Sequence, residues 1–343
     1  MKVTISDIAK AANVAKSTVS KVLNDSPKIS QETKRKVRDI MKQMNYTPSS
    51  IATGLARQSS YNIGLLVDMS KESEFLNQFF YNIIGGIESV IVTMKYELTI
   101  SNVQHNNPEG HFLNRLVLSK RVDGIIANNS VLTEELSNEL IRLQFPFVSI
   151  GELAGSVGWV DFDNELGGRM LTAHLLEQGY SDVAFVGGEQ NEKIFTHRCN
   201  GYLQALHQSG RTVHKDWIVN CKADEHEGYQ AALKLLQGEQ RPDSIVCMSN
   251  YTAFGVLQAA KELGIHVPTQ LGVAAFDEYP LSRYTTPPLT SLNIDTFKLG
   301  VSSGHLLMDR ILHPDMPPQH VLLEPELIQR ESTQRSSEPD SSS

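Results

Sequence analysis

Residues 3–46 carry apolar positions at helical spacing, in three short runs separated by turn residues. Thr4, with Asp7 three residues later, is typical of the start of a capped helix. Ser30, with Thr33 three residues later, can cap the third helix. The apolar positions are Ile8, Ala9, Ala11 and Ala12, then Val19, Val22 and Leu23, then Val37, Ile40, Met41 and Met44. The pattern therefore predicts three short amphipathic helices.

The first two of these helices are expected to form a helix-turn-helix. Asn13 fits the turn that ends the first helix, and the second run spans residues 15–24. Two short helices joined in this way can place the second helix in the major groove of DNA. Residues 1–60 hold eight Lys and three Arg against three Asp and one Glu, a net charge of +7. The remainder holds 20 basic and 35 acidic residues, so only the basic module is attracted to phosphate.

From residue 62 onward, apolar runs alternate with helical patterns. Residues 62–68 form a run typical of a buried parallel strand, and Phe79 opens a helical pattern after it. Further strands are expected at 96–100, 123–127, 147–150, 182–186, 244–248 and 272–275, and helices at 109–119, 164–178, 199–209 and 251–263. This alternation predicts parallel sheets covered by helices on both faces. Ligands of such folds bind beyond the carboxyl ends of the strands.

The composition is that of an ordinary globular protein. The chain has 343 residues, of which 40% are hydrophobic and 20% charged, enough for a sizeable core. It has no apolar run of about 18 residues and no apolar signal segment at its start, so we expect a cytoplasmic protein without a membrane span. Cys199, Cys221 and Cys247 form no CxxC pair, which favours reduced thiols over a disulfide or a zinc site.

Motifs of catalysis are missing, so we expect no enzyme, no cofactor and no metal. There is no GxGxxG after a strand, no GxxxxGK[ST], no HExxH and no GxSxG. Asp161 and Asp163 could form a catalytic pair, but turn and cap roles fit their spacing better. The acidic cluster at 224–227 could bind a metal, but it is typical of an acidic helix start. The polar tail, residues 332–343, lacks core residues and is expected to be disordered.

The chain resembles the LacI/GalR family of bacterial transcription regulators over about residues 3–331. The residues that carry the resemblance are Val3-Thr4-Ile5-Ser6-Asp7-Ile8-Ala9, Val14-Ala15-Lys16-Ser17-Thr18-Val19-Ser20-Lys21-Val22-Leu23-Asn24, Tyr46-Thr47-Pro48 and Ile51-Ala52-Thr53-Gly54-Leu55-Ala56. The resemblance implies an α/β protein with a helix-turn-helix headpiece, a hinge helix and a two-lobed body like that of periplasmic sugar-binding proteins. The implied ranges are 1–48 for the headpiece, 49–60 for the hinge and linker, 61–161 with 291–322 for the N-lobe, and 162–290 with 323–331 for the C-lobe.

The resemblance also implies which headpiece residues contact DNA. Lys16, Ser17 and Lys21 lie where the family contacts base edges, and the alternative is a phosphate contact or solvation. The family usually has Arg at the place of Lys21, and Lys lacks the planar fork of Arg. Phosphate contacts, which set the register on DNA, are implied for Thr4, Ser6, Asn24, Thr33 and Tyr46.

The implied hinge helix is short and contains Gly54, so it should be marginal alone. In the family it orders on DNA beside the hinge of the dimer mate. Leu55, with Ala52, lies where the family inserts an apolar wedge into the minor groove. Ser49 and Thr53 depart from the Asn and Arg that many members have, which puts part of the DNA affinity of the hinge in doubt.

A small-molecule effector between the lobes is implied as well. Asp277 and Arg198 match the positions that contact effector hydroxyls, with a structural ion pair or a helix cap as the alternative. Phe162 and Phe79 could offer apolar faces to the effector or pack in the core. Ser249 and Asn250 replace the Asn-Asp pair usual in the family, so the identity of the effector is in doubt.

These features predict a dimeric, ligand-responsive regulator that binds a pseudo-palindromic operator in double-stranded DNA. Among regulators, they favour a repressor. The expected effector is a sugar, because residues 158–164 are most similar to members that control the use of maltose or other oligosaccharides. A purine, a sugar phosphate or a partner protein is the alternative signal. A solute-binding transport protein would have a signal peptide and no basic headpiece, and an enzyme would need a catalytic constellation.

Overall fold

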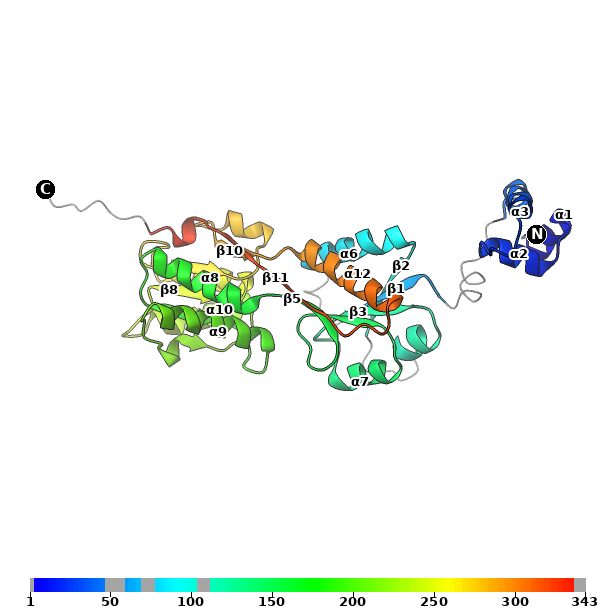
Figure 1. The fold of residues 1–343 in the computed structure, drawn as a ribbon. Helices are drawn as coiled ribbons and strands as arrows, with labels where there is room; N and C mark the ends of the chain where they lie inside the picture. Colours follow the sequence, from blue (N-terminus) through cyan, green and yellow to red (C-terminus); the bar gives the residue numbers. More distant parts are fainter. Residues whose placement is uncertain (1–2, 47–58, 69–77, 104–111, 336–343) are drawn as a thin grey trace. The chain divides into compact units, whose positions relative to one another are not determined.

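The computed structural model describes residues 3–46, 59–68, 78–103 and 112–335 (Figure 1). The headpiece has three helices, α1 (Ile5–Ala12), α2 (Lys16–Leu23) and α3 (Gln31–Gln43). Their apolar faces meet in a small core around Ile8, Val19 and Val37, which are fully buried. The three helices predicted from the apolar spacing are confirmed.

The ends of the headpiece helices are held by local polar contacts. The backbone N–H of Thr4 and its hydroxyl both donate to the Asp7 carboxylate, over 3.0 and 2.7 Å. The Ser30 hydroxyl accepts from the backbone N–H of Thr33 over 3.3 Å. Asn13 ends α1 in the left-handed conformation, with a φ of 52°. The starts predicted for the first and third helices are therefore confirmed, as is the turn at Asn13.

One six-stranded sheet has the strand order β11-β5-β4-β3-β1-β2. Its strands are β1 (Asn62–Val67), β2 (Glu97–Asn102), β3 (Gly124–Asn128), β4 (Phe147–Ile150), β5 (Gly158–Phe162) and β11 (His320–Leu323). The pairs β1–β2, β1–β3, β3–β4 and β5–β11 are parallel. The helical segments that accompany these strands are α6 (Gln78–Ile91), η1 (Val92–Met94), the π-helical η2 (Leu113–Leu118), α7 (Glu134–Arg142) and α12 (Thr296–Leu312).

A second six-stranded sheet has the order β12-β10-β9-β8-β6-β7. Its strands are β6 (Val183–Val186), β7 (Ile218–Val219), β8 (Ser244–Cys247), β9 (Gly272–Ala275), β10 (Thr290–Asn293) and β12 (Glu326–Ile328). Its helices are α8 (Asn164–Glu177), α9 (Lys193–Gln208), η3 (Lys215–Trp217), α10 (Glu225–Leu236), α11 (Asn250–Glu262), η4 (Pro280–Tyr284) and η5 (Glu331–Thr333). The pairs β9–β10, β6–β7, β6–β8 and β8–β9 are parallel, and β10–β12 is antiparallel. The expectation of parallel sheets therefore holds except at this edge.

The two sheets repeat one order of strands. The order β2-β1-β3-β4 in the first corresponds to β7-β6-β8-β9 in the second, so β1 and β6 hold equivalent places, as do β3 and β8. The chain divides into two compact units, residues 1–158 with 300–319 and residues 159–299 with 320–343. The predicted lobe boundaries near 161, 290 and 322 differ from these divisions and stay predictions. We refer below to the first unit and the second unit.

Helix α9 begins at Lys193, so the helix start expected at residue 199 was wrong. Among the first turns of α9, Phe195 is buried while Lys193, Ile194 and Thr196 are exposed. One buried position is too little to show a helical period in the sequence. The apolar spacing therefore predicted a helix only from Cys199 onward. Arg198 consequently lies inside a helix.

The polar tail begins later than expected. Ser332 and Thr333 were expected to be disordered, but both are fully buried in the second unit. The Ser332 hydroxyl donates to the carbonyl of Val273 over 2.6 Å and accepts from the N–H of Thr290 over 2.8 Å. The prediction was wrong because hydrogen bonds to backbone groups let these polar side chains be buried, which an apolar pattern cannot reveal. Residues 336–343 of the predicted tail lie outside the described residues.

Among the residues that the structure describes, no helix combines the length and the apolar character that crossing a membrane would require.

Candidate functional site

The predicted base-contacting residues lie on the exposed face of α2. Lys16, Ser17 and Lys21 are exposed, whereas Val19 and Val22 on the same helix are buried in the headpiece core. The helix therefore turns its apolar side inward and presents two ammonium groups and a hydroxyl to the surroundings. These groups can donate hydrogen bonds to guanine O6 and N7 or to phosphate oxygens.

The residues predicted to contact phosphate differ in their burial and in the contacts that they already make. The Thr4 hydroxyl already donates to Asp7, and this hydrogen bond lowers the pKa of the Asp7 carboxyl. The Thr33 hydroxyl lies 2.9 Å from that of Ser30, in the cap of α3. Tyr46 is half-buried and packs against the headpiece core. Ser6 is half-buried in α1, and Asn24 is half-buried at the end of α2.

Lys34 behaves differently from the other basic residues of α3. The apolar positions of α3 place a lysine at residue 34 on the polar side of the helix, but Lys34 is buried, with 4% of its surface exposed. Its ammonium group donates to the backbone carbonyl of Asp25 and lies 3.0 Å from the Asp25 carboxylate. Arg38 pairs with the same carboxylate over 2.9 Å, and the hydrogen bond from Lys34 is the main cause that lowers the pKa of Asp25. Lys34 therefore holds the loop between α2 and α3, and its charge is not free for DNA.

The predicted hinge lies almost entirely outside the described residues. This applies to Leu55 and Ala52, the predicted wedge, and to Ser49 and Thr53.

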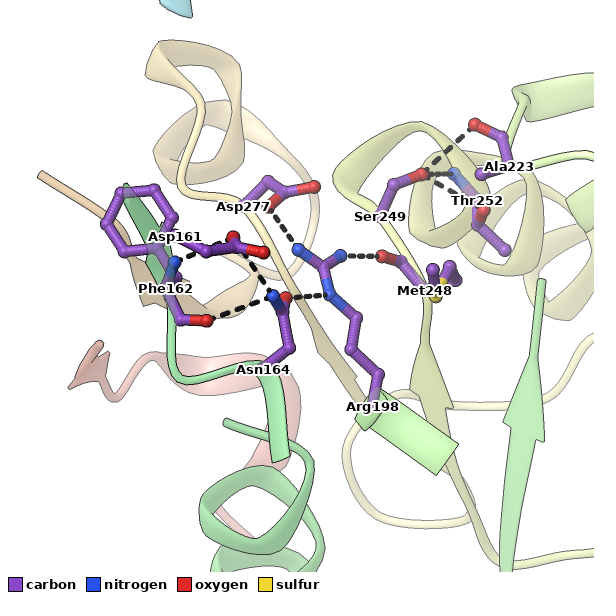
Figure 2. A network of polar contacts seen from close by, with 9 residues as sticks. All are labelled: Asp161, Phe162, Asn164, Arg198, Ala223, Met248, Ser249, Thr252 and Asp277. Atoms are coloured by element: carbon purple, nitrogen blue, oxygen red, sulfur yellow. Dashed lines mark hydrogen bonds and ion pairs between the residues drawn. The ribbon is translucent and has the colours of Figure 1, made fainter. Parts of the chain in front are cut away.

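In the second unit, Arg198 connects three segments of the chain at the carboxyl ends of the strands (Figure 2). Its side chain is buried, with 5% exposed. Nε donates to the side-chain oxygen of Asn164 over 2.9 Å, and Nη1 donates to the carbonyl of Met248 over 2.6 Å. Nη2 donates to Oδ1 of Asp277 over 3.2 Å. The guanidinium carbon also lies 4.0 Å from the centre of the Phe276 ring, a cation–π contact.

Asp277 presents its carboxylate at the surface of this network. It follows β9 and has a φ of 67°, in the left-handed region. Its side chain is 28% exposed, and Figure 2 shows one oxygen turned toward Arg198 and the other turned away. A carboxylate held on one side and accessible on the other can accept hydrogen bonds from hydroxyl or N–H groups of a ligand.

Asn164 and Asp161 complete the network on its other side. The Asn164 amide donates to the carbonyl of Phe162 over 3.1 Å and to Oδ1 of Asp161 over 3.3 Å. Asp161 also accepts from the N–H of Phe162 over 2.7 Å. Asp163 caps α8 by accepting from the N–H of Leu166 over 2.8 Å. The turn and cap roles expected for Asp161 and Asp163 are therefore observed.

The other predicted effector residues have mixed placements. Phe162 is 6% exposed, so little of its ring is available at the surface. Ser249 caps α11 by accepting from the N–H of Thr252 over 3.2 Å, and its hydroxyl donates to the carbonyl of Ala223 over 3.2 Å. Asn250 is buried, and its amide nitrogen has no hydrogen-bond partner among the described residues. Phe79 lies in α6, but its side chain is outside the described residues.

Two tyrosines that the sequence did not single out lie at this end of the second sheet. Tyr251 is the second residue of α11, directly after Asn250, and Tyr279 follows Asp277 by two residues. Their ring centres are 6.0 Å apart, and Tyr251 is 38% exposed. Burial, followed by the neighbouring Tyr279, raises the pKa of Tyr251. Each tyrosine lies four residues after the end of a strand, Tyr251 after β8 and Tyr279 after β9, and this repeat is a sequence signal that could have located the pair.

The remaining candidate chemistry is structural. Cys199, Cys221 and Cys247 are free thiols, and burial raises the pKa of Cys199 and of Cys221 to about 11. Asp224 caps α10 by accepting from the N–H of Glu227 over 2.8 Å, as expected of an acidic helix start. Within the described ranges, no group of three or more His, Cys, Asp or Glu side chains is arranged to hold a metal ion.

Comparisons with known protein families assign both parts of the chain. Residues 4–49 match the model of bacterial regulatory proteins of the lacI family. Residues 172–333 match the model of a periplasmic binding protein-like domain. Two curated relatives are both named HTH-type transcriptional repressor PurR. That of Actinobacillus pleuropneumoniae serotype 3 is 30% identical over 340 residues and covers 96% of this chain and 98% of its own. That of Vibrio atlanticus is 30% identical over 330 residues and covers 95% and 97%.

Solved structures agree with this assignment. The complex of the transcriptional regulator CelR with cellobiose is 25% identical, with a TM-score of 0.71, and covers 96% of this chain and 100% of its own. The lac repressor dimer bound to operator and the anti-inducer ONPF shares the fold, with a TM-score of 0.78, 23% identity and coverage of 97% and 99%. A helix-turn-helix headpiece followed by a two-part periplasmic-binding-protein-like body is thus the architecture of the chain.

Proposed function

Because the chain belongs to the LacI family of bacterial regulatory proteins, we propose that it is a transcriptional repressor that binds a pseudo-palindromic operator as a homodimer and responds to a small sugar. DNA binding and repression accord with the names of the relatives, and the sugar is the part argued from this chain. The observation that carries the sugar is the Asp277 carboxylate, which Arg198 holds from one side and which stays accessible on the other.

The DNA-binding half of the proposal rests on the exposed face of α2. Lys16, Ser17 and Lys21 act on base edges, and the wedge Leu55 with Ala52 acts in the minor groove. Thr4, Ser6, Asn24, Thr33 and Tyr46 set the register on the phosphates. Lys34 is excluded from this set, because its charge is buried against Asp25.

A direct test of DNA binding starts from the full-length protein and a randomised duplex library, from which the protein selects its own operator. Lys16→Ala should weaken binding to the selected duplex by roughly 1–3 kcal/mol and relax preference at one base pair. The matched control is Lys42→Ala, which removes the same charge from an exposed position of α3. It should change only the salt-dependent part of the affinity for the duplex. Equal losses for both variants would remove the base-reading role of Lys16.

The homodimer accords with apolar side chains that remain exposed in each unit. In the first unit these are Tyr81, Val92 and Ile100, and in the second Leu281 and Tyr284, of which Tyr284 is 76% exposed. A second copy of the chain that covered some of these side chains would remove their apolar surface from water, which favours association. Sedimentation of the full-length protein should give a dimer, and Tyr284→Asp should shift it toward monomer. An unchanged dimer would move the interface away from Tyr284.

The effector half of the proposal is a polyhydroxyl ligand at the carboxyl ends of β8 and β9. A carboxylate accepts two hydroxyl hydrogen bonds, and neighbouring polar groups on Asn250 and Ser249 add a donor and an acceptor. Phe162, which is 6% exposed, offers the ligand only a small apolar surface, and Phe79 stays a predicted apolar contact. Binding should raise the thermal stability of the full-length protein, by roughly 2.7 kcal/mol at a hundred times Kd.

Cellobiose, maltose, hypoxanthine and guanine are the probes that discriminate the sugar from its rival. A purine is the second candidate, because the relatives that are 30% identical carry the name PurR, which denotes a purine repressor. Asp277→Asn should abolish stabilisation by the effective sugar. Asp163→Asn, which changes the same group but keeps the cap of α8, should leave it intact. Stabilisation by a purine alone would overturn the sugar and keep the repressor.

A further inference from the structure

Asp123 holds the segment through which the chain enters the first sheet. It directly precedes β3, and its carboxylate accepts four hydrogen bonds from three consecutive residues. The backbone N–H of Ser60 donates over 2.7 Å, the Ser60 hydroxyl over 2.8 Å and the N–H of Tyr61 over 3.0 Å. The Ser59 hydroxyl donates as well. One half-buried carboxylate therefore gathers Ser59, Ser60 and Tyr61 in a single clamp.

The clamped segment has a conformation that needs support. Tyr61 has a φ of 52°, in the left-handed region that bulky residues seldom adopt. Its ring packs against Tyr96 with 5.3 Å between the centres, and its carbonyl accepts from the N–H of Glu97 over 2.9 Å. The backbone N–H of Tyr61 donates to the Asp123 carboxylate. Without that acceptor, the turn at Tyr61 loses the bond that fixes the direction of the chain before β1.

The second unit contains the same device in the equivalent place. Asp243 directly precedes β8, the counterpart of β3, and accepts from the segment that enters β6, the counterpart of β1. The N–H of Ser181 donates to its two oxygens over 3.1 and 3.0 Å, and the N–H of Asp182 donates over 2.9 Å. Arg335 adds an ion pair over 3.4 Å. The two carboxylates thus perform one structural task, which is to fix the entry of a strand.

What lies before each clamp differs. Ser181 and Asp182 follow α8, so Asp243 holds an internal loop of the second unit. Ser59 and Ser60 end the predicted hinge and linker, 49–60, so Asp123 holds the point to which the whole headpiece is attached. Given the proposed function, we infer that Asp123 is a positioning residue for operator binding: it fixes the end of the hinge to the first sheet, so that movement of that sheet reaches the hinge.

The inference rests on a general property of a hinge. Consider a short segment that orders only on DNA. A movement of the body can change how this segment orders if the end of the segment is fixed to the body. If that junction is loose, the body can move while the segment stays where it is. Charge-assisted hydrogen bonds are about twice as strong as neutral ones, so a carboxylate fixes three residues more firmly than an amide can. Asparagine retains the shape of Asp123 but offers one acceptor oxygen and an N–H₂ group where an acceptor is needed.

The test compares Asp123→Asn with Asp243→Asn in the full-length protein, using a duplex that the unchanged protein selects from a randomised library. Both variants should lower the melting temperature. At a temperature where both are folded, Asp123→Asn should weaken binding of the selected duplex about tenfold, whereas Asp243→Asn should leave it unchanged. Equal affinities for all three proteins, or equal losses in both variants, would overturn the inference.

Two further measurements keep the inference testable if Asp123→Asn folds poorly or if no duplex is selected. Ser60→Ala removes one hydrogen bond to Asp123 and should weaken duplex binding a few-fold with the fold intact; unchanged binding would count against the clamp. Hydrogen exchange without DNA should be faster at the N–H groups of Ser60 and Tyr61 in Asp123→Asn, and unchanged exchange would overturn the clamp itself. A protein that selects no duplex would overturn the proposed function, while the exchange result would still decide whether Asp123 fixes the junction.

Discussion

The headpiece and the second unit use polar contacts over very different distances along the chain. In the headpiece, Thr4 pairs with Asp7 and Ser30 with Thr33, each three residues apart, and Lys34 reaches Asp25 nine residues away. In the second unit, Arg198 bonds to residues that are 34, 50 and 79 positions away. The headpiece is therefore assembled from local signals, whereas the network around Arg198 exists only once several strands and helices have come together.

The two regions also place their predicted functional groups differently. Lys16, Ser17 and Lys21 are exposed and supported from behind by a small apolar core. Arg198 is buried, and its donors are occupied by Asn164, Met248 and Asp277. An exposed side chain of α2 can thus be removed with little effect on the fold. Removal of Arg198 should instead destabilise the second unit.

The largest expected effect is that of Arg198→Ala. It leaves the Asn164 oxygen, the Met248 carbonyl and the Asp277 carboxylate without their buried donor, which should cost about 3–5 kcal/mol in the free energy of unfolding. Urea unfolding of the full-length protein measures this cost. Arg169→Ala, which removes a half-buried guanidinium that contacts Gln204, is the matched control. A decrease in the free energy of unfolding no greater than that of the control would contradict the stabilising role of Arg198.

The next effect concerns the helix pair that places Arg198. At Gly201 a Cβ atom would lie 2.0 Å from the carbonyl oxygen of Glu165, so α8 and α9 touch backbone to backbone there. Gly201→Ala should push the helices apart at a cost of about 1–3 kcal/mol and weaken binding of the effector. Gly238→Ala, where no atom lies closer than 3.4 Å, is the control and should be nearly neutral. Calorimetry of both variants checks this, and equal stabilities would show that the helix contact is not limiting.

A smaller effect is expected in the headpiece. Lys34→Ala removes the ammonium group that donates to the Asp25 carbonyl, which should destabilise the loop between α2 and α3 by about 1 kcal/mol. Lys36→Ala, an exposed neighbour on α3, removes the same charge without this contact. Hydrogen exchange at the amides of α3 in the full-length protein should be faster only in the Lys34 variant. Similar exchange in the two variants would mean that Lys34 acts like any surface lysine.

The smallest effect is a pH dependence confined to the second unit. Burial lowers the pKa of His174, whose Nε2 lies 2.8 Å from the Thr333 hydroxyl. The unfolded chain therefore binds the proton more readily, so stability is complete above the unfolded pKa, about 6.5, and is lost as the pH falls below it. Thermal unfolding between about pH 7 and pH 5 should show this loss. His174→Gln should reduce it, and an undiminished loss would assign it to other groups.

Much of the fold could be predicted because its signals are short. The caps at Thr4 and Ser30 and the turn at Asn13 each depend on residues within one helical turn, so they were correctly predicted. Apolar runs such as those of β4 and β9 gave the strand bounds exhibited by the structure. Helix α12 was not predicted, because Gly300, Ser303 and Gly304 occupy buried positions in its first half and mask the apolar period. The edge strand β12 was not predicted either, because it has three residues, too few to show a period.

The sequence alone therefore determined the local elements, the basic headpiece on an acidic body and, through a long ordered resemblance, the family. Only the tertiary structure decided that Lys34 is buried, that Ser332 and Thr333 belong to the core, and that Asp123 and Asp243 are equivalent clamps. The physical reason is the same in each case. A polar group can be buried only where the folded chain brings it a hydrogen-bond partner, and those partners lie far away in the sequence.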